Sequence, residues 1–517
     1  MLILGLASGR HPSGFGGEWI GDLGQGTTER LEVVIDSAGG GGRVNLRSWG
    51  LRDVVARSIP IGRDSFGLAA VVEGDTVSFR GRIGEGTWTG EAVRGADRRP
   101  FELRRFEVLS DSAWTQLVGT YRAEDGRLLG VIRWAEFGPR PLVVDYQAGR
   151  IGPLYPLRRD RFLVGGSVVS PVFPADTLEV KFEPNSTVGR IRLVERGHTP
   201  VTGRRLTTRD EEVRFTDGDV TLAGTLTLPE GPGPYPALVL VHGSNAQPRE
   251  GFGPWTRYFA GLGYAVLAFD KRGTGRSTGD WREVGFGPLA GDVLAGSRLL
   301  ATRKDIRADK IGIWAISQAG WIAPLAISQA PKEFAFLVVH SGTGTTPLEQ
   351  GRLNLRYELQ FRGAPESEIA TALQYLELND SVTRTGKGWD RLQAFYESHR
   401  SEPNRLWRPQ PLDFWRRAYY RKFMDFDPRS SWETVRCPVL LLFGELDANV
   451  PPKESRPPIE EALRRAGNRS VTVKVFPKAN HVLFAAETGA ESEYPSRSRF
   501  APGYFETMGT WLAANAR

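Results

Sequence analysis

The chain has 517 residues, more than one hydrophobic core usually supports, so its length predicts two to four domains. Hydrophobic residues make up 40% of the chain and charged residues 25%, which is typical of a folded protein and excludes a disordered one. The net charge of +7 arises from 67 basic and 60 acidic residues scattered along the chain, without the basic run or motif that nucleic-acid binding requires, so we expect no nucleic-acid partner.

The chain starts with the apolar letters MLILGLASG but lacks the basic segment of a secretion signal. We interpret residues 1–16 as a flexible tail or a signal remnant. This leaves the compartment open, with an extracytoplasmic or secreted location favoured over the cytoplasm. No apolar stretch reaches the roughly 18 residues of a membrane helix, so no membrane span is expected.

Two β-rich modules are predicted next, over residues 17–110 and 111–206. In the first, short alternating runs such as LEVVID are broken by turn residues at 73–75 and 84–86, which predicts an antiparallel sheet or a small barrel. The second has the same style, in runs such as VGTYRAEDGRLLGVIRWAEF. We therefore expect one or two small antiparallel β domains.

Residues 207–517 have a different pattern of apolar and polar residues. A hairpin around Asp217 is followed by strands that are almost continuously apolar and are separated by helical stretches. This pattern predicts a parallel sheet covered by helices on both faces. The expected strands span residues 236–243, 264–270, 311–317, 334–342, 438–447 and 471–477. Between the fourth and fifth, residues 347–430 have helical periodicity, and an insertion of this length predicts a cap over a ligand crevice or a structural excursion.

Three residue types needed for nucleophilic catalysis occur at the ends of these strands. A serine hydroxyl requires a base within hydrogen-bond distance, and the base requires a group that fixes its tautomer. Ser317, Asp447 and His481 each follow a predicted strand, in the order expected for an α/β-hydrolase. Each alone could be a cap, a turn or a structural residue; together they predict a catalytic triad.

The serine lies in the sequence IGIWAISQAGWIAP, with Ala315 and Ala319 where the G-x-S-x-G pattern has glycine. Because strand and helix cross closely there, small side chains are required, and alanine adds only a methyl group. The backbone amides of Gln318 and of Ser244, in the HGSNAQ loop, are predicted to form an oxyanion hole. The alternative for that loop is a tight turn without a catalytic role.

Other candidates fit the chemistry less well. The segment 270–277, DKRGTGRS, lacks the spacing of a phosphate-binding loop and is expected to border the active site instead. Asp292 and Glu445 are possible substitute acids. The remaining histidines are His11, His198, His242, His340 and His399, and none is favoured as the base. No cluster has metal-ligand spacing, so neither a metal nor a cofactor is expected.

From about residue 210 the chain resembles bacterial α/β-hydrolases related to esterases and to serine peptidases of the dipeptidyl aminopeptidase or acylaminoacyl-peptidase type. The matching segments are LVLVHGS, FDKRGTGRS, WAISQAG, PVLLLFGELDANVPP and VFPKANH. The β-rich leader, with GEWIGDL and GEGTWTGEAV, resembles accessory domains found ahead of such hydrolases. The resemblance implies the same triad of Ser317, Asp447 and His481 and the same oxyanion amides.

These observations predict a serine carboxylesterase that acts on small to medium carboxylic esters through an acyl-enzyme. Related oligopeptidases of the prolyl type use a β-propeller to screen their peptide substrates. The roughly 200 β-rich residues of this chain are too few for a propeller of seven blades. Two alternatives stay open: a serine peptidase or amidase, and a protein whose β domains bind a polymer while the hydrolase is secondary. The oligomeric state is not predicted.

Overall fold

A computed structural model of the chain describes residues 16–24, 30–36, 41–60, 65–84, 86–138, 140–168, 176–183, 188–402, 405–409 and 414–516. Almost all of the predicted tail, including His11, lies outside these ranges. The chain divides into two compact units. The first comprises residues 1–118, 141–143 and 152–204, and the second comprises residues 119–140, 144–151 and 205–517.

The first β module is a closed barrel of eight antiparallel strands, because β1 pairs with both β2 and β8. Trp19, Trp88 and Phe101 fill its interior, with edge-on ring contacts between Trp88 and each of the other two. The strands are β1 (Gly17–Leu23), β2 (Arg30–Ile35), β3 (Gly41–Leu46), β4 (Leu51–Pro60), β5 (Ser65–Val72), β6 (Asp75–Ile83), β7 (Thr87–Arg94) and β8 (Asp97–Phe106). The alternation of buried and exposed residues along β8 is the pattern of a strand with one face in a core.

The second β module follows the short helix α1 (Asp111–Leu117) and is also a closed eight-stranded barrel. Its strands are β9 (Gly119–Ala123), β10 (Leu128–Ile132), β11 (Leu142–Asp145), β12 (Ile151–Arg158), β13 (Arg161–Val164), β14 (Thr177–Phe182), β15 (Val188–Val194) and β16 (Val201–Arg205). The hairpin of β9 and β10 belongs to the second compact unit. There Thr120 donates a hydrogen bond to the carbonyl of Arg257, and Trp134 packs edge-on against Trp255.

The second unit is built on an eight-stranded sheet in the order β17-β18-β20-β19-β21-β22-β23-β24. The last six strands in this order are parallel, whereas β17 and β18 are antiparallel. The strands are β17 (Arg209–Asp217), β18 (Val220–Leu228), β19 (Tyr235–Val241), β20 (Ala265–Phe269), β21 (Ile306–Ile316), β22 (Phe336–His340), β23 (Val439–Gly444) and β24 (Val471–Phe476). Every residue of β22 and β23 is buried, as expected for strands covered on both faces.

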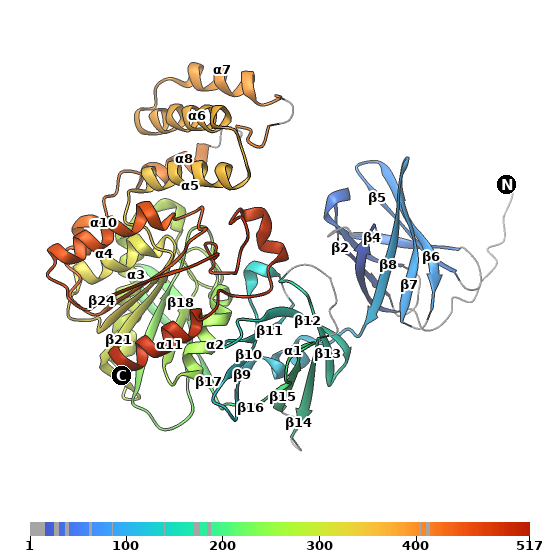
Figure 1. Cartoon of the computed structure of the whole chain (residues 1–517), viewed down its shortest axis with the longest axis horizontal. Helices are drawn as coiled ribbons and strands as arrows, with labels where there is room; N and C mark the ends of the chain where they lie inside the picture. Colours follow the sequence, from blue (N-terminus) through green and yellow to red (C-terminus); the bar gives the residue numbers. More distant parts are fainter. Residues whose placement is uncertain are drawn as a thin grey trace. The chain divides into compact units, whose positions relative to one another are not determined.

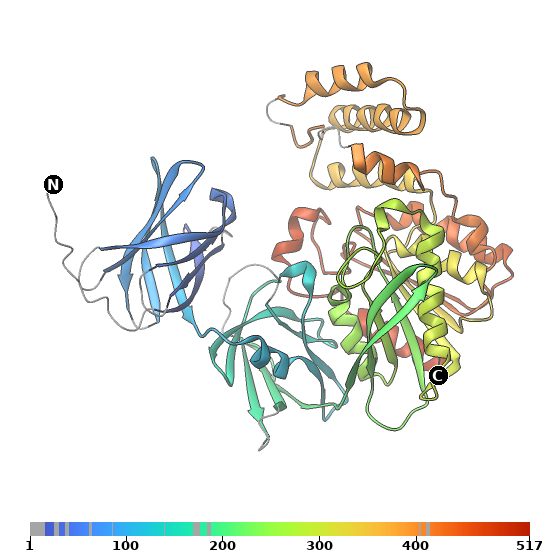
Figure 2. The ribbon, with the colours of Figure 1, turned by 180° about the vertical axis from the view of Figure 1, so that it is seen from behind.

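Helices cover both faces of this sheet (Figure 1), and the opposite view shows the second layer (Figure 2). On one face, α2 (Gly253–Gly261) and α11 (Tyr504–Asn515) pack together through Tyr258 and Phe505. The other face carries α3 (Phe286–Ala301), α4 (Ala319–Gln329), α9 (Arg429–Trp432) and α10 (Pro452–Arg465). Since β19 lies between β20 and β21, the chain changes direction there, and loops at the carboxyl ends of β19 and β21 meet at the crevice this creates.

Between β22 and β23 the chain forms a group of helices that we call the helical insertion, residues 347–432. It contains α5 (Pro347–Phe361), α6 (Glu366–Thr385), α7 (Trp389–His399), α8 (Phe414–Arg421) and the short α9. In Figure 1 these helices, apart from α9, are drawn in orange beyond one end of the sheet. A capping box of Thr346 and Glu349 starts α5. None of the helices in the described ranges is long and apolar enough to cross a membrane.

Candidate active site

Ser317 lies in the turn between β21 and α4. Its φ angle is +56°, a left-handed conformation that is costly for a residue with a side chain and is often found at functional sites. The turn is held by hydrogen bonds from the Ser317 amide to the carbonyl of His340 (2.9 Å) and from the Gly320 amide to the Ser317 carbonyl (2.8 Å). This strained turn presents Oγ of Ser317 to Nε2 of His481 at 3.0 Å.

The closest approach beside this turn occurs at Gly320. A methyl group on Gly320 would lie 2.7 Å from Cα of Gly342 and 2.8 Å from the amide nitrogen of Thr343, both backbone atoms. Ala315 and Ala319 are completely buried, and the structure accommodates a methyl group at each. The strict need for glycine is therefore at position 320.

His481 connects the serine to a buried carboxylate. Nδ1 of His481 lies 2.8 Å from Oδ2 of Asp447, whose side chain is fully buried. Oδ1 of Asp447 accepts a hydrogen bond from the Val450 amide at 2.8 Å. Because a carboxylate only accepts, Nδ1 carries the proton, and Nε2 is left to accept the proton of the Ser317 hydroxyl. The structure thus brings the three predicted residues together in hydrogen-bonding order.

The charges around His481 favour its protonated form. Burial lowers its pKa, but the charge and hydrogen bond of Asp447, together with the charges of Glu136 and Glu491, raise it above its ordinary value overall. Glu136 lies in η2 (Ala135–Phe137), after β10, and Glu491 begins η5 (Glu491–Ser496). Loss of solvation around its carboxyl group raises the pKa of Glu136 itself, although the charge of His481 acts in the opposite direction. Sequence reasoning missed both glutamates, because no motif marks them and Glu136 lies far from His481 in sequence.

The backbone of His481 is held by two side chains at the end of β22. Its carbonyl oxygen accepts hydrogen bonds from Nε2 of His340 at 3.0 Å and from Oγ of Ser341 at 2.9 Å. Tyr504 donates to Nδ1 of His340 at 2.8 Å and accepts from Nε1 of Trp255 at 2.7 Å. Burial, with the nearby charge of His481, lowers the pKa of His340 to about 3, so it stays neutral. His340 therefore supports the backbone of His481 and lies outside the series of hydrogen bonds from Ser317 to Asp447.

The two predicted oxyanion amides belong to loops that lie next to each other. A methyl group on Gly243, which precedes Ser244, would lie 3.5 Å from Cβ of Ser317. In the described part of the chain, neither the Ser244 amide nor the Gln318 amide donates to another protein group. Backbone donors near a nucleophile that lack a protein acceptor are suited to hold an anionic oxygen.

The substitute acids and the phosphate-loop alternative are engaged elsewhere. Asp292 forms a buried ion pair with Arg272, with contacts of 2.6 and 2.8 Å, and Glu445 accepts from the Lys478 amide at 2.9 Å. In the segment 270–277, the carboxylate of Asp270 accepts from the Arg276 amide and is paired with Arg249. The Arg276 amide and the Arg249 guanidinium are thus engaged by the loop's own carboxylate, not directed at an external phosphate group.

The other described histidines lie outside the triad. His242 is buried, and burial, with the charge of Lys271, lowers its pKa to about 3; its Nε2 hydrogen-bonds to the carbonyl of Phe269. His399 stacks on Phe395 at the end of α7, and His198 is exposed in a turn.

Helix α5 contacts the loop that carries Asp447. Asn354 donates to Oδ1 of Asn449 at 2.6 Å, and Gln350 donates to the Asn449 carbonyl. Further along the same face, Tyr357 donates to Glu454 at 2.8 Å. One face of α5 is therefore bound to the residues that directly follow Asp447.

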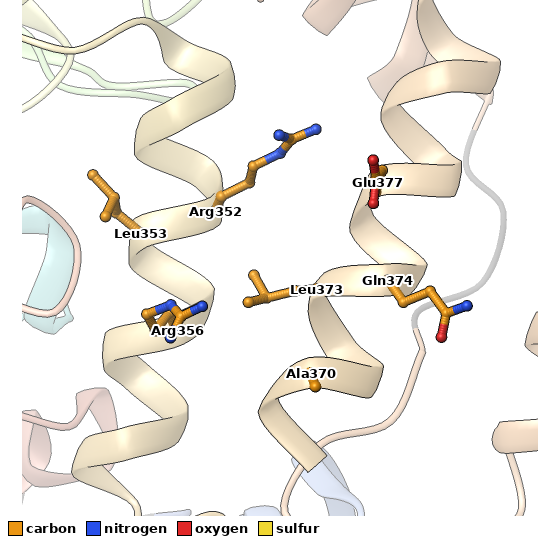
Figure 3. Close-up of a pocket in the computed structure, with 7 residues that line it drawn as sticks. All are labelled: Arg352, Leu353, Arg356, Ala370, Leu373, Gln374 and Glu377. Carbon is orange, nitrogen blue, oxygen red and sulfur yellow. The ribbon is translucent and has the colours of Figure 1, made fainter. Parts of the chain in front are cut away.

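A cavity of about 370 Å³ lies between α5 and α6. Arg352 from α5 and Leu373 from α6 point into the space between the two helices (Figure 3). The lining residues are Arg352, Leu353, Arg356, Ala370, Leu373, Gln374 and Glu377. None of them belongs to the triad or to the oxyanion loops, so this cavity is separate from the site of Ser317.

A mostly parallel sheet with a serine on a strained turn after one strand, followed in the chain by an aspartate and a histidine at later strand ends, is an α/β-hydrolase domain. Residues 238–491 match the alpha/beta hydrolase family, so this domain is similar to members of that family. The predicted fold, an α/β-hydrolase domain preceded by small antiparallel β domains, is confirmed.

Known proteins resemble this domain at low identity. Esterase EstD of Thermotoga maritima is 25% identical over 312 residues, which cover 58% of this chain and 68% of that protein. An esterase structure from Pyrococcus furiosus has a TM-score of 0.39 and 18% identity, covering 60% of this chain and 92% of the other. A proline iminopeptidase-related protein of Thermus thermophilus has a TM-score of 0.37 and 20% identity, covering 60% and 99%.

Proposed function

We propose that this protein is a serine carboxylesterase that hydrolyses small to medium carboxylic esters. The observation that carries the proposal is the hydrogen-bonded series from Ser317 Oγ to His481 Nε2 (3.0 Å) and from His481 Nδ1 to Asp447 Oδ2 (2.8 Å). The similarity to esterase EstD supports an ester substrate. In this function Ser317 is the nucleophile, His481 the general base and acid, and Asp447 the group that orients His481.

The reaction follows from this geometry. Oγ of Ser317 forms a bond to the ester carbonyl carbon while its proton passes to Nε2 of His481. The carbonyl electron pair moves onto oxygen, and the amides of Ser244 and Gln318 stabilise the resulting anion. Collapse of the intermediate breaks the bond to the alcohol, which leaves with the proton from His481. Water then attacks the acyl-enzyme by the same steps and releases the acid.

The decisive experiment compares wild-type protein with Ser317→Ala on a short-chain p-nitrophenyl ester. We expect the variant to lose kcat by about 10⁴-fold or more and to unfold at the wild-type temperature. Ser328→Ala, in the same α4 helix, is the matched control and should keep its activity. A fluorophosphonate probe should label wild-type protein at Ser317. Full turnover by Ser317→Ala, or no labelling of wild-type protein, would reject the proposed function.

A second candidate, hydrolysis of an amide with a free amino group, is favoured by one observation. The negative charges of Glu136 and Glu491 raise the pKa of His481. Negative charge at this place would also attract the ammonium group of an aminoacyl substrate. Rates on an aminoacyl nitroanilide and on its N-acetylated form separate the two candidates. A clear preference for the free amine, at a rate comparable to the best ester, would favour the amidase.

A further inference from the structure

Lys271 is a buried cation between the two segments that carry the oxyanion amides. It follows β20 by two residues, and only 2% of its surface is exposed. Its Nζ donates to the carbonyl oxygen of Gly243 at 2.9 Å and to Oε1 of Gln318 at 2.9 Å. It also lies 5.3 Å from the centre of the Trp281 ring, where a cation is attracted to the aromatic face.

No carboxylate among the described residues hydrogen-bonds to Lys271. Asp292 acts on it only through its charge. The next residue, Arg272, is different, since it pairs with both Asp292 and Asp217 at 3.0 Å or less. Arg272 thus has the ion pairs of a structural cation, whereas Lys271 is bound by neutral groups.

Burying an ammonium group in this way is costly. Burial lowers the pKa of Lys271 to about 7, although the charge of Asp292 acts in the opposite direction. An apolar side chain of similar length, such as methionine, would fill the same space without this desolvation cost. The cation is therefore not explained by packing.

The contacts of Lys271 explain what the cation can do for the site. The carbonyl of Gly243 and the amide of Ser244 belong to one planar peptide group, in which the two bonds point in opposite directions. Fixing the carbonyl oxygen therefore fixes the direction of the Ser244 N–H. A cation on that carbonyl also polarises the peptide and makes its N–H a stronger donor. Through Oε1, the same ammonium holds Gln318, whose backbone N–H is the second predicted donor.

We propose that Lys271 is a positioning residue that aligns the Ser244 and Gln318 amides toward one oxyanion. The inference rests on the proposed function, because it assigns a role within the same hydrolytic site. A preorganised donor is most effective in the transition state, when the carbonyl oxygen has become negative. Loss of Lys271 should thus affect kcat much more than KM.

The test is Lys271→Met, measured with the p-nitrophenyl ester and with a trifluoromethyl ketone inhibitor. Oγ of Ser317 adds to the ketone carbonyl, the carbonyl electrons move onto oxygen, and the proton passes to His481, so the adduct contains the oxyanion. We expect kcat to fall about 100-fold, KM to change less than about threefold, and inhibitor affinity to fall in parallel with kcat/KM. Lys422→Met, which removes an exposed lysine paired with Glu283, is the control and should match wild type.

The failure of this inference can be distinguished from failure of the proposed function. If Ser317→Ala is inactive while a folded Lys271→Met keeps wild-type kcat and inhibitor affinity, only the positioning role is overturned. A change in KM of the size expected for kcat, with kcat itself unchanged, would also overturn the positioning role. If Lys271→Met does not fold, Lys271→Gln decides, because its amide can still donate but carries no charge. We expect an intermediate loss of kcat in Lys271→Gln, and wild-type kcat would overturn the inference.

Discussion

Nε2 of His340 donates a hydrogen bond to the carbonyl oxygen of His481 across 3.0 Å. His340, which ends a strand, is thus a buried support for the backbone of His481. Replacing it by His340→Phe keeps a ring of similar size but removes the donor. Because buried polar groups would lose a partner, we expect a loss of about 1–3 kcal/mol in the free energy of unfolding, and a lower kcat. Urea unfolding and ester kinetics measure both; wild-type stability would contradict this role.

The same residue makes stability depend on pH. The pKa of His340 is about 3 in the folded state and about 6.5 when unfolded, so only the unfolded chain takes up a proton between these values. The stability that neutral His340 contributes to the folded state is fully present above pH 6.5 and is lost as the pH falls toward 3. Asp292 and Asp380, whose burial raises each pKa to about 6, act in the opposite direction, so the comparison must be with a variant.

We therefore expect the stability of His340→Phe to fall less steeply than that of wild type between pH 6 and 4, by about 1.4 kcal/mol per pH unit. Unfolding curves at three pH values measure the difference. Parallel pH dependences would show that His340 is charged in the folded protein.

The raised pKa of His481 predicts the shape of the pH–rate profile. In the proposed reaction His481 must be neutral to accept the serine proton, so kcat/KM should rise with pH, with a midpoint above 6.5. Glu136→Gln removes one of the charges that raise this pKa and should shift the midpoint to lower pH. Glu397→Gln, on helix α7, is the control and should leave the midpoint unchanged. An unshifted midpoint in Glu136→Gln would show that its charge does not reach His481.

Gly320 should tolerate no side chain, because the nearest atoms are backbone atoms that cannot rotate away. Gly320→Ala places a methyl group 2.7 Å from Cα of Gly342, so we expect about 1–3 kcal/mol of destabilisation and a displaced Ser317 with lower activity. Ala319→Gly is the comparison. It restores the usual glycine of the motif and should keep the position of Ser317, with about 1 kcal/mol lost from helix propensity. Thermal unfolding and ester turnover test both; a fully stable Gly320→Ala would be the contrary result.

Much of the fold could be predicted from the sequence, because apolar runs separated by helical stretches have few other interpretations. The predicted strand 438–447, for example, includes β23, although the strand itself ends at Gly444 and Asp447 follows three residues later. The proximity of Ser317, Asp447 and His481 follows from parallel strands that end at one edge, whereas their chemical roles stay predictions.

The supporting residues could not be predicted in this way. Lys271 contacts Gly243 and Gln318 because β19 lies between β20 and β21 in the sheet. The order of strands in a sheet cannot be deduced from the sequence of any single strand. Its position directly after a strand, within DKRGTGRS, was the one available signal. No sequence signal marks Glu136, since it lies on a connection within the second barrel.

The hydrogen bonds between α5 and the loop after Asp447 also bear on how substrate reaches the serine. If the helical insertion moves to admit a substrate, α5 cannot swing outward without releasing Asn449, two residues from the acid that orients His481. Opening and catalytic readiness would then be mechanically linked. In the proposed esterase, opening of the helical insertion would thus disturb the loop of Asp447, and its return would restore that loop.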